Sequence, residues 1–138
     1  MWWRTAVLAV LVTATTAGIG ACSDDEGSAE ELCQAVRANP SITSTFQGFD
    51  PTDASAAVEQ LRTALVSLEQ LRDAAPAEVR DDIVVEIDYV TDLIEGLGEV
   101  PEGEPAEAVG VVQRVTGEHP DVGQAAANLE AFAASSCR

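Results

Sequence analysis

Residues 58–71 read VEQLRTALVSLEQL and residues 79–97 read VRDDIVVEIDYVTDLIEGL, and these two stretches decide the fold. Apolar residues recur in both at spacings of three and four, which places them on one face of an α-helix. The first stripe comprises Val58, Leu61, Leu65, Leu68 and Leu71. The second comprises Val79, Ile83, Ile87, Val90, Ile94 and Leu97. We therefore predict two long amphipathic helices, separated by Ala74-Ala75-Pro76, that share an aliphatic core.

A shorter helix is predicted before this pair. Ser28 is suited to the N-cap position, and Glu31 stands three residues later, where a capping box places its acidic residue. Asn39-Pro40 ends the helix because the residue before a proline is biased away from helical geometry. The next helix is expected to take Thr52 or Asp53 as its cap, and the one after it to begin at Pro76.

A fourth helix is predicted near the C-terminus. Gly96 and Gly98 should stop the second long helix, and Pro105 should begin the next. Pro120 must kink or break that helix, which resumes from Asp121 to Ser136. These elements predict an all-α fold, an antiparallel four-helix bundle with an interrupted last helix.

The charge of the chain restricts its partners. The 138 residues carry a formal charge of -17, and every basic residue is Arg, since the sequence contains no Lys. Nucleic-acid binding depends on Lys and Arg neutralising phosphates, so we expect no nucleic-acid partner. Anionic lipid headgroups should also repel the protein, and membrane attachment therefore needs a source other than charge.

The N-terminus has the organisation of an export signal. Arg4 precedes a short run of Ala, Val, Leu and Thr that Gly18 and Gly20 interrupt. A membrane-spanning helix needs about 20 apolar residues, so a cleaved signal peptide fits this run better than a permanent anchor.

The junction Ile19-Gly20-Ala21-Cys22 resembles the bacterial lipobox, in which the cysteine receives a lipid. The resemblance implies a signal peptide over residues 1–21, a lipidated flexible tether over 22–29 and a helical domain over 30–138. It also implies lipid anchoring through Cys22 on the extracytoplasmic face of the cell membrane. The alternative is an ordinary secretory signal followed by an unrelated cysteine.

The cysteine count supports lipidation of Cys22. An exported domain usually pairs its cysteines, and this chain has three. If Cys22 carries lipid, Cys33 and Cys137 are left to form a disulfide near the two ends of the domain. Two reduced thiols in a core are the alternative.

The sequence offers few residues for catalysis or metal binding. His119 is the only histidine and stands between Glu118 and Asp121, a spacing that matches no metal motif. No glycine-framed serine or phosphate-binding glycine loop is found. We therefore expect no enzyme activity, no catalytic residue, no metal and no cofactor.

Acidic residues on the second long helix could form carboxylate pairs, since positions four apart share a helix face. Asp82 with Glu86, or Asp88 with Asp92, would be the pairs, and paired carboxylates can bind a hard cation or act as acid and base. Our interpretation is a solvated face. We interpret the acids in the next loop in the same way: Glu99, Glu102, Glu104 and Glu107.

Phe46 and Phe49 lie in the connection before the first long helix. They could form an apolar mouth for a lipid or small ligand between the helices, or they could simply close the core.

Beyond the lipobox, several features resemble small, alanine-rich actinobacterial-type lipoproteins and secreted helical proteins. They are Glu31-Leu32-Cys33 after the tether, the junction from Leu71 to Val79, and Ser135 to Arg138 at the end. The resemblance implies helical content and an envelope location. We hypothesise a non-enzymatic binding or adaptor module for an envelope protein partner. The alternative is a carrier of a small apolar ligand or lipid in a cavity between helices.

Overall fold

The computed structural model describes residues 27–39 and 49–138 of the chain. These residues form five helices and no strand, which confirms the all-helical prediction. The helices are α1 (Ala29–Ala38), α3 (Ala54–Ala74), α4 (Ala77–Gly98), α5 (Pro105–Glu118) and α6 (Val122–Ser136).

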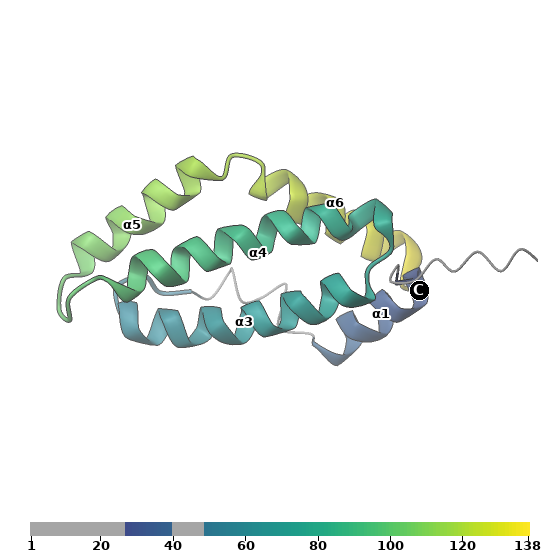
Figure 1. Cartoon of the computed structure of the whole chain (residues 1–138), viewed down its shortest axis with the longest axis horizontal. Coiled ribbons are helices and arrows are strands. Elements are labelled where there is room, and N and C mark those ends of the chain that lie inside the picture. The colour runs from purple at the N-terminus through teal and green to yellow at the C-terminus, as the bar shows by residue number, and fades with distance from the viewer. Residues whose placement is uncertain (1–26, 40–48) are drawn as a thin grey trace, which may run out of the picture.

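Helix α4 lies at the centre of the arrangement (Figure 1). It packs against α3, α5 and α6, whereas α1 packs against α3 and α6. Helices α5 and α6 follow one another along α4, with α5 near its C-terminal half and α6 near its N-terminal half (Figure 1). The two halves of α4 therefore have different neighbours.

The predicted helix starts are largely confirmed. The Ser28 side chain accepts a hydrogen bond from the Glu31 N–H (3.2 Å), and the Glu31 carboxylate accepts one from the Ser28 N–H (2.9 Å), completing the capping box. Asp53, rather than Thr52, caps α3 by accepting a hydrogen bond from the Ala56 N–H (3.0 Å). Pro76 is the N-cap residue of α4 and not its first helical residue, so that boundary was wrong by one position.

Helix ends near glycine and proline follow the prediction with one exception. Helix α5 begins at Pro105, and the chain breaks between Glu118 and Val122 around Pro120. Helix α4 ends at Gly98, but Gly96 lies inside it and does not stop it. A Cβ at Gly96 would lie 2.6 Å from Val111 Cγ1, so this glycine permits the close approach of α5 to α4.

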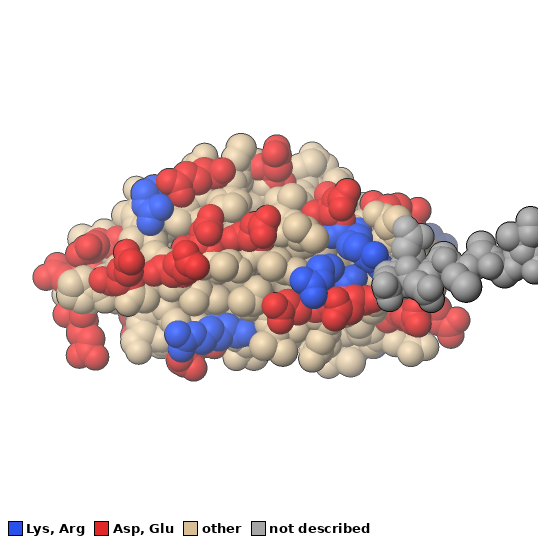
Figure 2. Space-filling view, viewed as in Figure 1, with Lys and Arg blue, Asp and Glu red and all other residues tan. Residues whose placement is uncertain are grey.

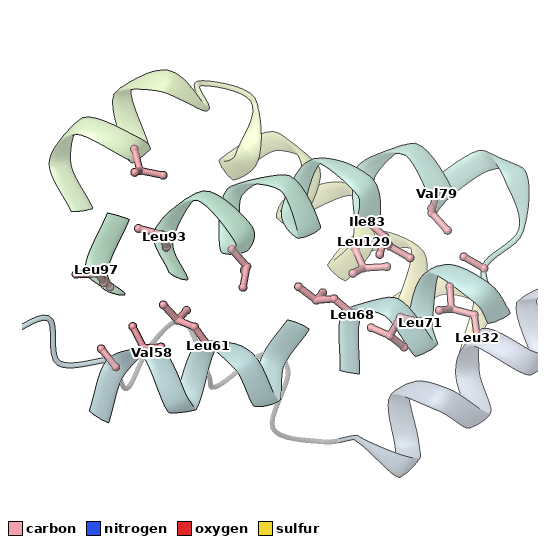
Figure 3. Close-up of a cluster of buried hydrophobic side chains, with 14 of the residues drawn as sticks. Leu32, Val58, Leu61, Leu68, Leu71, Val79, Ile83, Leu93, Leu97 and Leu129 are labelled. Carbon is pink, nitrogen blue, oxygen red and sulfur yellow. The ribbon is translucent and has the colours of Figure 1, made fainter. Parts of the chain in front are cut away.

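The core lies mainly between α3 and α4, whose aliphatic side chains point toward one another (Figure 3). Leu32 of α1 and Leu129 of α6 close it at the end near the α3–α4 turn. Our predicted stripes were wrong at three positions, since Leu65, Ile87 and Ile94 are only partly buried. The fully buried positions of α4 are Val79, Ile83, Glu86, Val90, Leu93 and Leu97.

The predicted disulfide is present. Cys33 of α1 and Cys137, the C-cap residue of α6, are bonded with a Cα–Cα distance of 5.2 Å. The bond joins residues 104 positions apart and fastens the end of α6 to α1. No helix in the described part of the chain is both long and apolar enough to cross a membrane.

Candidate functional site

Three of the five predicted site residues, Phe49, Cys33 and Cys137, lie in the described part of the chain. Cys22 and Phe46 lie outside the described residues. Phe49 is partly buried and packs against the hydrophobic core. Cys33 and Cys137 are bonded to one another.

Glu86 is the residue that sequence reasoning misplaced most. Its side chain occupies a core position of α4 and is only 4% exposed, so the interpretation of Glu86 as part of a solvated face was wrong. The buried positions of α4 are spaced four, three, four, three and four residues apart, which is the regular spacing of a helix seam. Glu86 occupies one of these positions, between Ile83 and Val90. That spacing is the signal in the sequence that could have identified it.

The surroundings of Glu86 disfavour a charged carboxylate. Its Oε1 atom has no hydrogen-bond partner among the described residues. Burial, together with the nearby carboxylates of Asp82 and Glu130, raises the pKa of Glu86 from 4.5 to about 7. Glu86 therefore holds a proton in the folded protein at mildly acidic pH.

Asp82 also connects α4 to α6. Its Oδ1 atom accepts a hydrogen bond from Asn128 Nδ2 (3.0 Å), and Gln124 Nε2 donates to Asn128 Oδ1 (2.8 Å). The proposed pairing of Asp82 with Glu86 thus brings together one carboxylate used in helix docking and one buried carboxyl group. Asp82 joins α4 to α6 and Glu86 is buried, so the two carboxyl groups do not form an open pair.

His119 lies at the junction of α5 and α6, where it contacts α4. Its Nε2 atom is 2.7 Å from Asp92 Oδ2, and its side chain is 17% exposed. The ring packs edge-on against Tyr89, with 5.7 Å between the centroids. Tyr89 in turn shares a 3.1 Å hydrogen bond with Thr116. These contacts hold the break between α5 and α6 against α4.

The predicted neighbours of His119 are not its partners in the structure. Glu118 forms an ion pair with Arg114 (3.2 Å) instead, and Asp121 forms no side-chain cap for α6. An imidazole paired with a carboxylate resembles part of a catalytic triad. Within residues 27–39 and 49–138, however, no hydroxyl or thiol is hydrogen-bonded to His119. The contacts of His119 therefore support a structural role, in which its side chain holds the α5–α6 junction against α4.

A groove lies at the end of the molecule where α3 begins and α4 runs into α5. Its volume is about 660 Å³. Val58, Leu97, Val100 and Ala108 supply apolar surface to it. Its charged residues are Asp53, Glu59, Arg62, Glu102 and Glu104. Phe49 is not among the described residues that line it, and Phe46 lies outside the described residues, so the predicted ligand mouth stays a prediction.

The remaining acids near the groove are exposed. Glu99, Glu102, Glu104 and Glu107 are all solvent-exposed, as predicted. Arg62 Nη1 contacts Glu59 Oε1 at 2.7 Å, which leaves the lining acidic overall. Among the described residues, no group of three or more His, Cys, Asp or Glu side chains is arranged to hold a metal ion.

The fold and its polar clusters define a small, acidic, all-helical protein closed by one disulfide. No family model, curated protein or solved structure matches the chain.

Proposed function

We propose that the protein is an extracytoplasmic lipoprotein, anchored by lipid on Cys22. Residues 1–21 act as the signal peptide, residues 22–29 as the tether and residues 30–138 as the helical domain. The observation that carries this proposal is the Cys33–Cys137 disulfide. Because it uses two of the three cysteines, Cys22 is the one left for lipidation at the lipobox junction. A disulfide also suits an oxidising compartment outside the cytoplasm.

We take the domain to be an antiparallel four-helix bundle in which α5 and α6 are the two halves of one interrupted helix. A tether entering at α1 would reach the end of the domain near the α3–α4 turn, because Gly27 lies against the backbone of Ala74. The groove at the start of α3 lies at the opposite end of α4. A helix of 22 residues is about 33 Å long, so the groove faces away from the anchor.

Within this location we propose a non-enzymatic binding or adaptor module for an envelope protein partner. We assign the polar clusters a structural role and not a catalytic one, because they join helices to one another. His119 and Asp92 hold the α5–α6 junction, and Asp82 with Asn128 joins α4 to α6. The strongly acidic charge disfavours nucleic acid.

A carrier of a small apolar ligand or lipid is the second candidate, favoured by the groove. Its volume, about 660 Å³, lies within the range of small-molecule sites. Native mass spectrometry of the protein taken from its own membranes would test this role. A carrier predicts a retained apolar molecule that a Val100→Asp variant, changed at a partly buried groove residue, loses without unfolding, whereas an empty protein contradicts the carrier role.

Replacing Cys22 tests the anchoring proposal. The Cys22→Ser variant, labelled in its own cells with a fatty-acid analogue, should lose the lipid label and fail to be cleaved before residue 22. The matched control is Ser23→Ala, which should be lipidated and cleaved like the unaltered chain. Normal labelling or cleavage of Cys22→Ser contradicts the proposal.

A further inference from the structure

One face of the α3–α4 pair carries large apolar side chains that pack against the edge of the core or lie exposed. Leu65, Ile87 and Ile94 follow the periodicity of core residues but are only partly buried. Val66 is 53% exposed and Val84 is 37% exposed. An apolar residue exposed singly needs no explanation, but a continuous group of them marks an interaction surface.

Helix geometry places these residues together. On α4, contacts with α5 and α6 are made by Asp82, Tyr89 and Gly96, which stand seven residues apart and share one side of the helix. Val84, Ile87 and Ile94 lie on the other side of the buried seam. The open side of α4 therefore faces away from both C-terminal helices.

The two sides of α3 also differ, because one side contacts α1 and the other does not. Ser67 and Gln70 are hydrogen-bonded to Asn39, beside the end of α1. Leu65 stands two residues before Ser67, so it lies almost opposite the side that contacts α1. Val66 stands four residues before Gln70, so it lies at the outer edge of α3, beyond Leu65. We call the surface formed by Leu65, Ile87, Ile94 and Val84, with Val66 at its outer edge, the open face.

The groove extends the open face toward the α4–α5 loop. Val58 and Arg62 line the groove and stand seven and three residues before Leu65, on the same side of α3. Gly98 lines it from α4, four residues after Ile94. From Val84 to Gly98 the surface spans about 20 Å of helix, which matches a partner helix of about four turns.

Acidic side chains border this surface on both sides. On α4, Asp81, Asp88 and Glu95 are exposed beyond the apolar positions, and on α3 Glu59 and Glu69 are exposed. Figure 2 shows uncharged surface over α3 and α4 with both acidic and basic groups beside it. The basic groups on this side have local partners, since Arg62 pairs with Glu59, Arg72 pairs with Asp73, and Arg80 donates to the Ala75 carbonyl. Asp81, Asp88, Glu95 and Glu69 form no ion pair among the described residues. Two copies of a chain with a formal charge of -17 would bring like charges together along these borders. Charge complementarity therefore favours a basic partner over a second copy.

We propose that the open face and the groove bind an amphipathic helix of an envelope protein, with aliphatic residues on one side and Lys or Arg along its edges. Such a helix would place its apolar side chains between α3 and α4, the mode by which helices bind apolar grooves. Its basic residues would face Asp88, Glu95 and Glu69. This inference rests on the adaptor role in the proposed function and specifies the partner.

Site-specific photocrosslinking of the full-length chain in its own cells tests the proposal. A photoreactive phenylalanine analogue replaces Val66 or Val84 on the open face. The control positions are Gln113 on α5 and Ala131 on α6, which are exposed on other helices. We expect adducts several-fold more abundant at Val66 and Val84 than at the controls. Mass spectrometry should locate them in a basic amphipathic helix of another protein.

Four outcomes overturn the proposal: equal adducts at open-face and control positions, adducts to a second copy of this chain, adducts to phospholipid, or adducts to an acidic or non-helical segment. The failure of the lipoprotein proposal is separable from these outcomes. It appears as unchanged lipid labelling of Cys22→Ser and does not depend on where the crosslinks form. If protein crosslinks concentrate at Gln113 and Ala131, the adaptor role stands and the open face is wrong.

Discussion

The two sides of α4 differ in chemistry. The side that contacts α5 and α6, which we call the covered side, includes a glycine and polar groups, among them Asp82, Tyr89, Asp92 and Gly96. Helices α5 and α6 also bring aliphatic residues to the core, including Val115 and Leu129. The side that stays uncovered by the described helices carries Val84, Ile87 and Ile94. Burial of aliphatic surface is the main favourable term in folding, so aliphatic residues left accessible on the open side contribute less to stability than buried ones would. An external helix partner, as we propose, would explain why this apolar surface stays accessible.

The disulfide should give the largest effect, because it fastens α6 to α1 at the end of the covered side. Replacing both Cys33 and Cys137 with Ser should lower the free energy of unfolding by about 4 to 5 kcal/mol, the chain-entropy value for a loop of this length. Urea denaturation would measure it. Reduction of the unaltered protein is the control and should give a similar loss. A loss no larger than that of a surface mutation contradicts this account of the covered side.

Glu86 should give the second largest effect and make stability depend on pH. Its pKa is about 7 in the folded protein and 4.5 in the reference state, so the folded state retains the proton more strongly. Its contribution is full below about pH 4.5 and is lost as the pH rises through about 7. The Glu86→Gln variant should therefore be more stable than the unaltered protein at pH 8, by about 3 kcal/mol, and nearly equal to it at pH 4.

Denaturation across this pH range would compare Glu86→Gln with Glu95→Gln, a matched change at an exposed position of the same helix. The control should follow the unaltered protein. If the difference between Glu86→Gln and the unaltered protein is the same at every pH, Glu86 does not titrate in the core as described.

Gly96 should give an intermediate effect on the covered side. A Cβ there would meet Val111 Cγ1 at 2.6 Å, so Gly96→Ala should push α5 from α4 and cost about 1 to 3 kcal/mol. Gly110→Ala is the control because no atom lies within 4 Å of its added Cβ. That change should stabilise the helix by about 0.5 to 1 kcal/mol. Thermal melting of both variants would measure these effects, and equal effects of the same sign would refute the close approach.

His119 should have a smaller effect. The His119→Ala variant loses the contact with Asp92 and the packing on Tyr89, at a cost of about 1 kcal/mol. Hydrogen exchange should show faster opening around the α5–α6 junction than in α3. Arg114→Ala, which removes only an exposed ion pair with Glu118, is the control and should change little. If His119→Ala changed hydrogen exchange equally across the whole domain, the contacts of His119 would not act locally at the α5–α6 junction.

The open face should give the smallest effect on stability. Val66→Lys and Val84→Lys should each change the free energy of unfolding of the purified protein by no more than about 0.5 kcal/mol, because the side chains are exposed. Leu68→Lys, in the buried core, should unfold the protein. Thermal melting separates these cases, and strong destabilisation by Val84→Lys would mean that the open face is part of the core.

Local sequence signals predicted most of the helices. Ser28 with Glu31, Pro105 and Pro120 act through the backbone within a few residues, so each marked its boundary correctly. The pairing of Cys33 with Cys137 followed from counting cysteines. The lipidation of Cys22 stays a prediction.

Contacts between distant helices were harder to predict. His119 lies 27 residues from Asp92, and only the packing of α5 against α4 brings them together. Apolar residues at 83–85, 87, 90 and 93–94 allow two neighbouring registers for the buried side of α4. Our prediction took the register that buries no charged residue. The observed register includes Glu86 and leaves Ile87 and Ile94 at the border of the open face.

The most direct test of the open face compares its accessibility in the purified protein and in isolated envelopes. A Val84→Cys variant is labelled with a bulky maleimide, and Gln113→Cys serves as the control on α5. We predict rapid labelling of both variants when purified, and protection of Val84→Cys alone in envelopes. High salt should relieve this protection because it screens the charges that hold a basic helix. Equal labelling of Val84→Cys in both preparations would contradict the account.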